Sequence, residues 1–159
     1  MIQTTMKEAL ARKDEIKDHY LYLIRNENGY LYVGQSKHPF KRLRNHINAW
    51  ESRIGAYIKR SKPDSLLWVI ELFTIEECEP IIMEHRHLNY KSYWLCKSDP
   101  SRFKRALDIA EAALIHCYQP AHNSSLNGLG SGYALEEREL VNLFARLNLD
   151  DNAVDFIHL

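Results

Sequence analysis

Apolar and polar residues follow two different spacings along the first part of the chain, and these spacings predict strands as well as helices. Residues 5–18 are mostly polar and are predicted to form a helix. The runs HYLYLIRN and GYLYVGQS follow, rich in tyrosine, leucine, isoleucine and valine, and turn residues at 26–29 separate them. Two such runs joined by a short turn predict a β-hairpin.

A helical spacing begins after the hairpin. Between residues 38 and 60 the apolar residues recur at steps of three and four, which places them in one stripe along a helix. The stripe consists of Phe40, Leu43, Ile47, Trp50 and Ile54. Pro39 suits the first turn of this predicted helix, because backbone N–H groups there have no partner within the helix.

The remainder of the chain predicts one more strand and several helices. Residues 65–73 form a short apolar run typical of a buried strand, and residues 75–95 and 103–118 are predicted to be helical. A turn-rich segment follows, and residues 134–147 and 151–158 are predicted to form short C-terminal helices. This order indicates an α+β fold in which helices flank a small three-stranded sheet.

Length and composition fit one soluble domain. The chain has 159 residues, of which 45% are hydrophobic and 26% charged. No stretch approaches the roughly 20 apolar residues of a membrane span, and the N-terminus lacks the apolar core of a signal peptide. We therefore expect a cytoplasmic protein with no membrane partner. Cys78, Cys96 and Cys117 form no paired motif, and we expect reduced, mostly buried thiols.

The charges are unevenly distributed although the net charge is zero. Residues 37–62 contain eight basic residues and one acidic residue, whereas residues 134–159 contain six acidic and two basic residues. A local basic surface is the usual footprint of a protein that binds phosphates. A solvated helix face would explain the same pattern, so charge alone leaves both interpretations open.

The register of the hairpin decides whether Tyr22 and Tyr32 can act together. A loop at residues 27–29 with a bulge beside Gly29 pairs Tyr22 with Gly34 and places both tyrosines on one face of the sheet. A two-residue turn at Asn28-Gly29 would place them on opposite faces. A shared site requires the first register, in which the missing side chain of Gly34 would leave room for a substrate.

Two predicted helices carry further candidate chemistry. Arg42 and His46 are four residues apart and therefore lie on one helix face, where an arginine can bind a phosphate and a histidine can transfer a proton. Glu111 lies among apolar residues, where a carboxylate is costly unless it is paired or bound to a metal. Asp108, one turn earlier, could share a cation such as Mg²⁺. A salt bridge from Glu111 to Arg42 or another base is the alternative.

The segment YLYLIRNENGYLYVGQSKHPFKRLRNH resembles the motif of the GIY-YIG nuclease family. Residues 20–22 stand where the family has Gly-Ile-Tyr, residues 32–34 stand where it has Tyr-Ile-Gly, and Arg42 and His46 follow at the expected spacing. Residues 111–123 are similar to the family's closing element, a helix glutamate followed by a Gln-Pro turn and an asparagine. Tyr20 replaces the first glycine of the motif, a position that is structural in the family.

The resemblance implies a DNA endonuclease that hydrolyses phosphodiester bonds with Mg²⁺ or another divalent cation and no organic cofactor. It implies catalytic roles for Tyr22, Tyr32, Arg42, His46 and Glu111, with Glu111 as the metal ligand. Tyr22 or His46 would activate the attacking water, and the sequence leaves this choice open. Substrate-binding or site-ordering roles are predicted for Gly34, Lys41, Arg44 and Asn123.

We expect a nuclease domain at residues 1–127, with a helical insertion at about 74–102, followed by a linker and a C-terminal helical extension at 128–159. Glu84, in the insertion, is the alternative metal ligand. A chain of this length favours a restriction or defence enzyme that acts on DNA as a homodimer. A repair or branched-DNA nuclease and a catalytically silent DNA-binding module are the alternatives.

Overall fold

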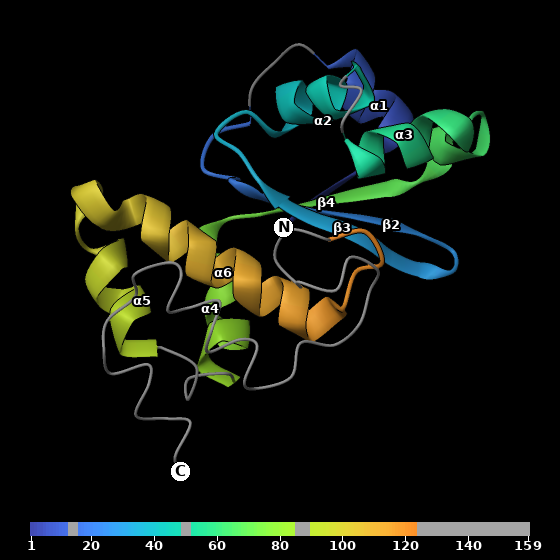
Figure 1. Cartoon of the computed structure of the whole chain (residues 1–159). Coiled ribbons are helices and arrows are strands. Elements are labelled where there is room, and N and C mark those ends of the chain that lie inside the picture. Colours follow the sequence, from blue (N-terminus) through green and yellow to red (C-terminus); the bar gives the residue numbers. More distant parts are fainter. Residues whose placement is uncertain (13–15, 49–51, 85–89, 124–159) are drawn as a thin grey trace.

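The computed structural model describes residues 1–12, 16–48, 52–84 and 90–123 (Figure 1). The predicted linker and C-terminal helices lie outside these residues. So does Trp50 of the predicted apolar stripe.

Four strands form one antiparallel sheet in the order β1-β4-β2-β3. The strands are β1 (Ile2–Thr5), β2 (Leu21–Asn26), β3 (Gly29–Gln35) and β4 (Val69–Phe73). The α+β class is therefore confirmed, with one strand more than predicted. The additional strand, β1, has only four residues and two of them are threonines, so the alternation of apolar and polar residues is too short to reveal it.

Helices cover both faces of the sheet, as Figure 1 shows. One face carries α1 (Met6–Ala11), α2 (Pro39–Asn48) and α3 (Arg53–Arg60). The other carries α4 (Ile75–Glu84), α5 (Tyr90–Lys97) and α6 (Phe103–Tyr118). Two short 3₁₀ segments, η1 (Asp64–Leu67) and η3 (Pro100–Arg102), precede β4 and α6.

Each face of the sheet has its own apolar core, because successive side chains of a strand point to opposite faces. On β2, Leu21 and Leu23 pack with residues of α4, α5 and α6, whereas Tyr22 and Ile24 pack with residues of α1, α2 and α3. The central strand β2 therefore contributes Tyr22 to the face that carries α2, which is the helix of Arg42 and His46.

The single helix predicted for residues 38–60 was wrong, because α2 and α3 are separate helices. The Ser52 side chain caps the N-terminus of α3 by accepting a hydrogen bond from the Gly55 backbone N–H at 3.1 Å. Gly55 lies so close to α2 that a Cβ there would be 1.7 Å from the carbonyl oxygen of His46. The missing side chain lets the two helix backbones touch at this point.

Three other predicted boundaries also changed. The strand predicted from residue 65 begins at Val69, because residues 64–67 form η1. The N-terminal helix predicted for 5–18 is α1, which ends at Ala11. The described part of the predicted 75–95 helix is divided between α4 and α5.

The helix predicted for residues 103–118 is confirmed as α6. None of the helices within the described ranges combines the length and apolarity of a membrane span. Cys78, Cys96 and Cys117 are free thiols as predicted, of which the first two are buried and Cys117 is exposed.

The hairpin pairs Tyr22 with Gly34, as predicted, but through a different turn. Asn26 pairs with Gly29, so the loop has two residues rather than three, and the register shifts at Leu31 instead of beside Gly29. The Asn26 side chain holds this turn by accepting a hydrogen bond from the backbone N–H of Asn28 at 2.9 Å. The bulge restores the register in which Tyr22 and Tyr32 share one face.

Candidate functional site

Two tyrosine rings lie over Gly34 on the face of the sheet that carries α2. The ring centroids of Tyr22 and Tyr32 are 6.0 Å apart. A Cβ added to Gly34 would lie 2.4 Å from Cζ of Tyr22 and 2.8 Å from Cε1 of Tyr32. The space that we expected Gly34 to leave for substrate is therefore filled by the two tyrosines, and the glycine permits their close approach to the strand.

Tyr22 and His46 form a buried hydrogen bond that joins β2 to α2. The Tyr22 hydroxyl lies 3.0 Å from Nε2 of His46, and Nδ1 of His46 lies 2.7 Å from Oγ of Ser52. Because Ser52 also caps α3, the start of that helix holds the imidazole ring in place. The result is a chain of three side chains from Tyr22 through His46 to Ser52.

Burial shifts the proton equilibria of both members of the Tyr22–His46 pair. Tyr22 is fully buried and His46 is 7% exposed. Burial, with the nearby Tyr32, raises the pKa of Tyr22 well above its usual value, although the charge of Arg42 opposes this shift. Burial and the Arg42 charge lower the pKa of His46 to about 4. At neutral pH Tyr22 is therefore a neutral phenol that shares a hydrogen bond with a neutral imidazole.

Tyr32 and Arg42 complete this side of the site. The Tyr32 ring packs edge-on against His46 with centroids 5.4 Å apart, and burial raises the pKa of Tyr32. Arg42 is exposed on α2, and its positive charge acts on Tyr22, Tyr32 and His46. One exposed positive charge on α2 thus acts on the buried tyrosines and on His46.

Glu111 reaches the same region from α6, on the other face of the sheet. Its negative charge raises the pKa of Tyr22 and of Tyr32, and the Arg42 charge acts on it in turn. Side chains from both faces can meet here because β3 is an edge strand. The structure therefore brings together all five residues predicted to be catalytic.

A carboxylate pair lies at the end of β3. Nε2 of Gln35 donates hydrogen bonds to Oδ1 of Asp108 at 2.6 Å and to Oε2 of Glu111 at 2.7 Å. Lys104 forms an ion pair with Asp108 and donates to Oε1 of Gln35 at 3.1 Å. Glu111 is 9% exposed, and its burial raises its pKa to about 7 although the Gln35 hydrogen bond opposes the shift.

This donor set fits a hard divalent cation. Carboxylate oxygens of Asp108 and Glu111 converge on one point, which the nitrogen of Gln35 occupies. Mg²⁺ is commonly held by one or two carboxylates together with waters and substrate phosphates. Among the described residues no three histidine, cysteine or acidic side chains are grouped for metal binding, so waters and the substrate would supply the other ligands.

The Asn123 side chain forms hydrogen bonds to the backbone of the edge strand β3. Its Oδ1 accepts a hydrogen bond from the Val33 N–H at 2.8 Å, and its Nδ2 donates to the Val33 carbonyl at 2.7 Å. The backbone N–H groups of Ala121 and His122 donate to the carbonyls of Tyr30 and Leu31. Of the two predicted roles for Asn123, this geometry suits the ordering of the site.

The remaining predicted residues lie around the site or away from it. Lys41 is exposed on α2. Arg44 donates to the backbone carbonyl of Arg12 at 2.5 Å, which holds its guanidinium against the end of α1. Glu84, the alternative metal ligand, is exposed at the end of α4.

Sequence reasoning missed Gln35 and Ser52. Gln35 immediately follows the Tyr-Ile-Gly equivalent, but nothing in the sequence shows that α6 packs beside it. Ser52 had a weak signal, since serine is one of the residues preferred at the N-cap of a helix. The unbroken apolar stripe outweighed that signal.

The comparison with known families agrees with this geometry. Residues 18–93 match the GIY-YIG catalytic domain. This part of the chain is therefore similar to the GIY-YIG catalytic domain, and the similarity supports nuclease activity in general. The match ends within α5 and includes Tyr22, Tyr32, Arg42 and His46, whereas α6 with Glu111 follows it. No curated protein and no solved structure shows a significant match to the chain.

Proposed function

We propose that this chain is a metal-dependent DNA endonuclease of the restriction or defence type. The observation that carries the proposal is the 3.0 Å hydrogen bond between the Tyr22 hydroxyl and a His46 with a lowered pKa. It lies beside the Arg42 charge and the Glu111 carboxylate. A nuclease needs a proton acceptor, a cation for the phosphate and a negatively charged metal ligand, and these groups supply all three.

Tyr22 and His46 act as a relay in this proposal. A buried tyrosine with a raised pKa is a poor phenolate, so Tyr22 does not act as a preformed base. As a water attacks phosphorus, the Tyr22 hydroxyl accepts its proton while passing its own proton to Nε2 of His46. Nδ1–H of His46 donates to Ser52 in this tautomer, which leaves Nε2 free to accept.

Arg42 and Tyr32 position the phosphate. The exposed Arg42 guanidinium can bind two non-bridging oxygens and offset the charge that builds up on them. Tyr32, which packs against His46, presents its hydroxyl beside the same phosphate and orients the attacking water.

Glu111 and Asp108 would hold the Mg²⁺ ion or another divalent cation. When bound, the cation supplies stabilisation of the leaving oxygen. Gln35 would have to turn its amide nitrogen away, because that nitrogen now occupies the point on which both carboxylates converge. One site of this kind cuts one strand, so cleavage of both strands by a restriction or defence enzyme favours a homodimer.

The first experiment tests cleavage of supercoiled plasmid and of branched DNA, with Mg²⁺ and with EDTA. The variants are Glu111→Gln, which keeps the shape of the side chain, and Glu84→Gln as the matched control on the alternative ligand. We expect cleavage that requires Mg²⁺, survives Glu84→Gln and falls at least 100-fold in Glu111→Gln. Discrete plasmid fragments would support the restriction or defence type.

Three outcomes would contradict parts of the proposal. Cleavage at branches alone would replace restriction by repair of branched DNA. Salt-sensitive binding without cleavage, over a library of DNA sequences, would indicate a silent binding module. If Glu84→Gln abolishes cleavage and Glu111→Gln does not, the metal ligand is Glu84 on α4 rather than Glu111.

A further inference from the structure

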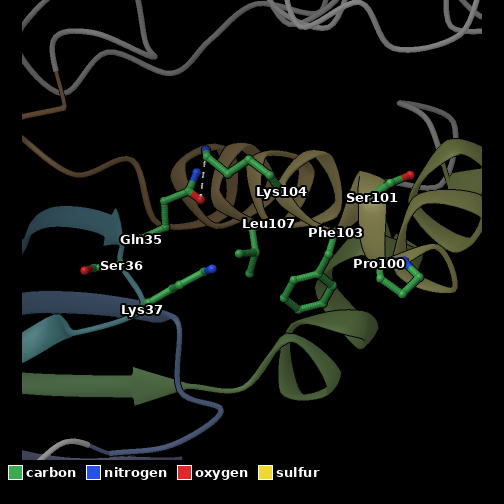
Figure 2. Close-up of a pocket in the computed structure, with 8 residues that line it drawn as sticks. All are labelled: Gln35, Ser36, Lys37, Pro100, Ser101, Phe103, Lys104 and Leu107. Atoms are coloured by element: carbon green, nitrogen blue, oxygen red, sulfur yellow. Dashed lines mark hydrogen bonds between the residues drawn. The ribbon is translucent and has the colours of Figure 1, made fainter.

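A hollow of about 380 Å³ opens beside the carboxylate pair, between the end of β3 and the start of α6. Figure 2 shows the side chains that line it. They include Gln35, Lys37, Ser101, Phe103, Lys104 and Leu107. Its volume lies within the range of about 300–1,000 Å³ that is typical of small-molecule sites.

The walls of the hollow differ in chemistry. Lys37 and Lys104 extend into it from the strand side and from α6 (Figure 2). Within the described part of the chain Lys37 forms no ion pair, whereas Lys104 is paired with Asp108. Two carboxylates, Asp108 and Glu111, lie beside these two ammonium groups. Lys37 is the ammonium group left without an acidic partner among the described residues, and its charge suits a phosphate.

The floor of the hollow is apolar. Leu107 is 5% exposed, and the half-buried Phe103 ring is held edge-on by Tyr20, with centroids 5.6 Å apart. A ring fixed in this way can support the flat face of a nucleobase. A phosphate ion alone has no apolar surface to bury against Leu107 and Phe103. The hollow therefore suits a ligand that has both a charged part and a flat apolar part.

The hollow also adjoins the proposed reaction site. Gln35 lines it and donates to both Asp108 and Glu111. A nucleotide in the hollow would therefore be one side chain away from the carboxylates. A DNA strand that presents its scissile phosphate to Arg42 and Glu111 would bring a neighbouring nucleotide to this place.

We infer that this hollow, here called the flanking pocket, binds one unstacked nucleotide next to the scissile phosphate. The base lies against Phe103 and Leu107, and its phosphate lies between Lys37 and Lys104. Unstacking a base requires energy that a contact with an aromatic ring can offset. This inference rests on the proposed function, because it names part of the substrate of the same site.

The test uses a single-stranded DNA tetranucleotide and the same tetranucleotide with one abasic position, without a divalent cation so that no cutting occurs. NMR signals of the Leu107 methyl groups and of the Phe103 ring report on the pocket. We expect both to shift saturably, with binding about tenfold weaker for the abasic strand and for Phe103→Leu. Lys37→Gln should reduce, by about 0.7, the slope with which the logarithm of the binding constant falls with the logarithm of salt concentration.

Lys7→Gln is the matched charge control, because Lys7 is exposed on α1, on the opposite face of the sheet. It should change neither affinity nor salt slope by a comparable amount. Lys37 is exposed as well, so Lys37→Gln tests the pocket even if Phe103→Leu perturbs the fold.

The results separate the pocket from the nuclease. Equal binding of intact and abasic strands, or no shift of the Leu107 signals, would overturn the flanking pocket even if the chain cuts DNA. Saturable, base-dependent shifts in a protein that cuts no DNA would leave the pocket standing and remove the proposed function.

Discussion

At the scale of single residues, Gly34 shows how a site depends on an absent side chain. The Tyr22 and Tyr32 rings occupy the space that any Cβ at this position would need. The hydroxyl of Tyr22 reaches His46 only because its ring lies close above the strand. The sequence suggested that Gly34 leaves room for a substrate. In the structure, the glycine is instead needed so that Tyr22 can pack close enough to the strand to reach His46.

Gly34→Ala should displace both tyrosines. We expect a loss of about 1–3 kcal/mol in the free energy of unfolding, because the added methyl group overpacks a buried site. We also expect at least a tenfold loss in kcat, because the Tyr22–His46 hydrogen bond would be strained. Urea denaturation and DNA cleavage measure the two effects.

Gly29→Ala is the control for this variant. Gly29 has a φ of +137° and no atom near its missing side chain, so the variant strains the turn without touching the tyrosines. It should lose stability and keep its kcat. If Gly34→Ala also keeps its kcat, close packing of Tyr22 on the strand is not needed for catalysis.

Ser52 is the second residue whose role appears only in three dimensions, because it joins the imidazole of His46 to the start of α3. Ser52→Ala should lower the free energy of unfolding by about 1 kcal/mol, the usual cost of removing an N-cap. It should also lower kcat about tenfold with little change in KM, because His46 loses the partner that sets its tautomer. Steady-state cleavage kinetics check this.

Thr5→Ala provides a matched comparison, since Thr5 caps α1 in the same way and lies on β1, at the edge of the sheet opposite β3. We expect a similar loss of stability and an unchanged kcat. Ser52→Thr should restore kcat because it keeps the hydroxyl group. Equal effects of Ser52→Ala and Thr5→Ala on kcat would show that Ser52 acts through stability alone.

At the scale of elements, the edge strand β3 carries the site and needs support on its free side. The segment after α6 provides it, through the Asn123 side chain and the backbone of Ala121 and His122. Gln119 makes the turn out of α6 with a left-handed backbone, φ +48°. The role of Asn123 in the structure is therefore explained by its hydrogen bonds to the backbone of β3.

Asn123→Ala should release the middle of β3. Two buried backbone groups of Val33 would lose their partners, which costs about 1–3 kcal/mol each. The amide hydrogen of Val33, which donates to Asn123, should exchange with solvent much faster. The exchange rates of the amides in the interior strand β2 should rise only as much as the loss of global stability requires. Residue-resolved hydrogen exchange measures these rates. An unchanged exchange rate of the Val33 amide would contradict the role of Asn123 in holding β3.

The elements themselves were predicted unevenly. The hairpin, β4, α2 and α6 follow from apolar spacing, because each has a buried face that repeats over several residues. The separation of α2 from α3 does not, because the apolar stripe continues from one helix to the other and the contact between Gly55 and the backbone of α2 is a tertiary feature. The strand β1 exists because β4 offers it a partner, with Ile2 opposite Leu72.

At the scale of the whole molecule, burial between two helical layers determines the protonation of the site. His46 is buried on the side of α2 that contacts the sheet. Its pKa is lowered to about 4 from an ordinary value of 6.5. Above pH 6.5 the folded and unfolded chains both carry neutral His46. As the pH falls from 6.5 to 4, the unfolded chain binds a proton that the folded chain does not.

The free energy of unfolding should therefore contain a His46 contribution that falls between pH 6.5 and 4. The loss is on the order of 3 kcal/mol for a shift of this size. The raised pKa of Glu111 acts in the opposite direction over an overlapping range, so the contribution is measured as wild type minus His46→Gln. Denaturation curves across this pH range check it, and a difference that stays constant with pH would contradict the lowered pKa.

The sequence by itself determined the α+β class and predicted the principal residues of the proposed site. These features rest on local spacing: the tyrosines of a hairpin, the four-residue step from Arg42 to His46, and the carboxylate on an apolar helix face. The family match confirmed the resemblance. The sequence also predicted the Tyr22–Gly34 register, although not the turn that produces it.

Only the tertiary structure decided how these groups act. Residues 24 positions apart form the Tyr22–His46 bond, and residues 76 positions apart form the contact between Gln35 and Glu111. The pKa values follow from burial between layers, the role of Gly34 follows from the rings above it, and the flanking pocket follows from the meeting of β3 with α6. Such contacts and solvent exclusion depend on the distances between elements, which local sequence patterns do not contain.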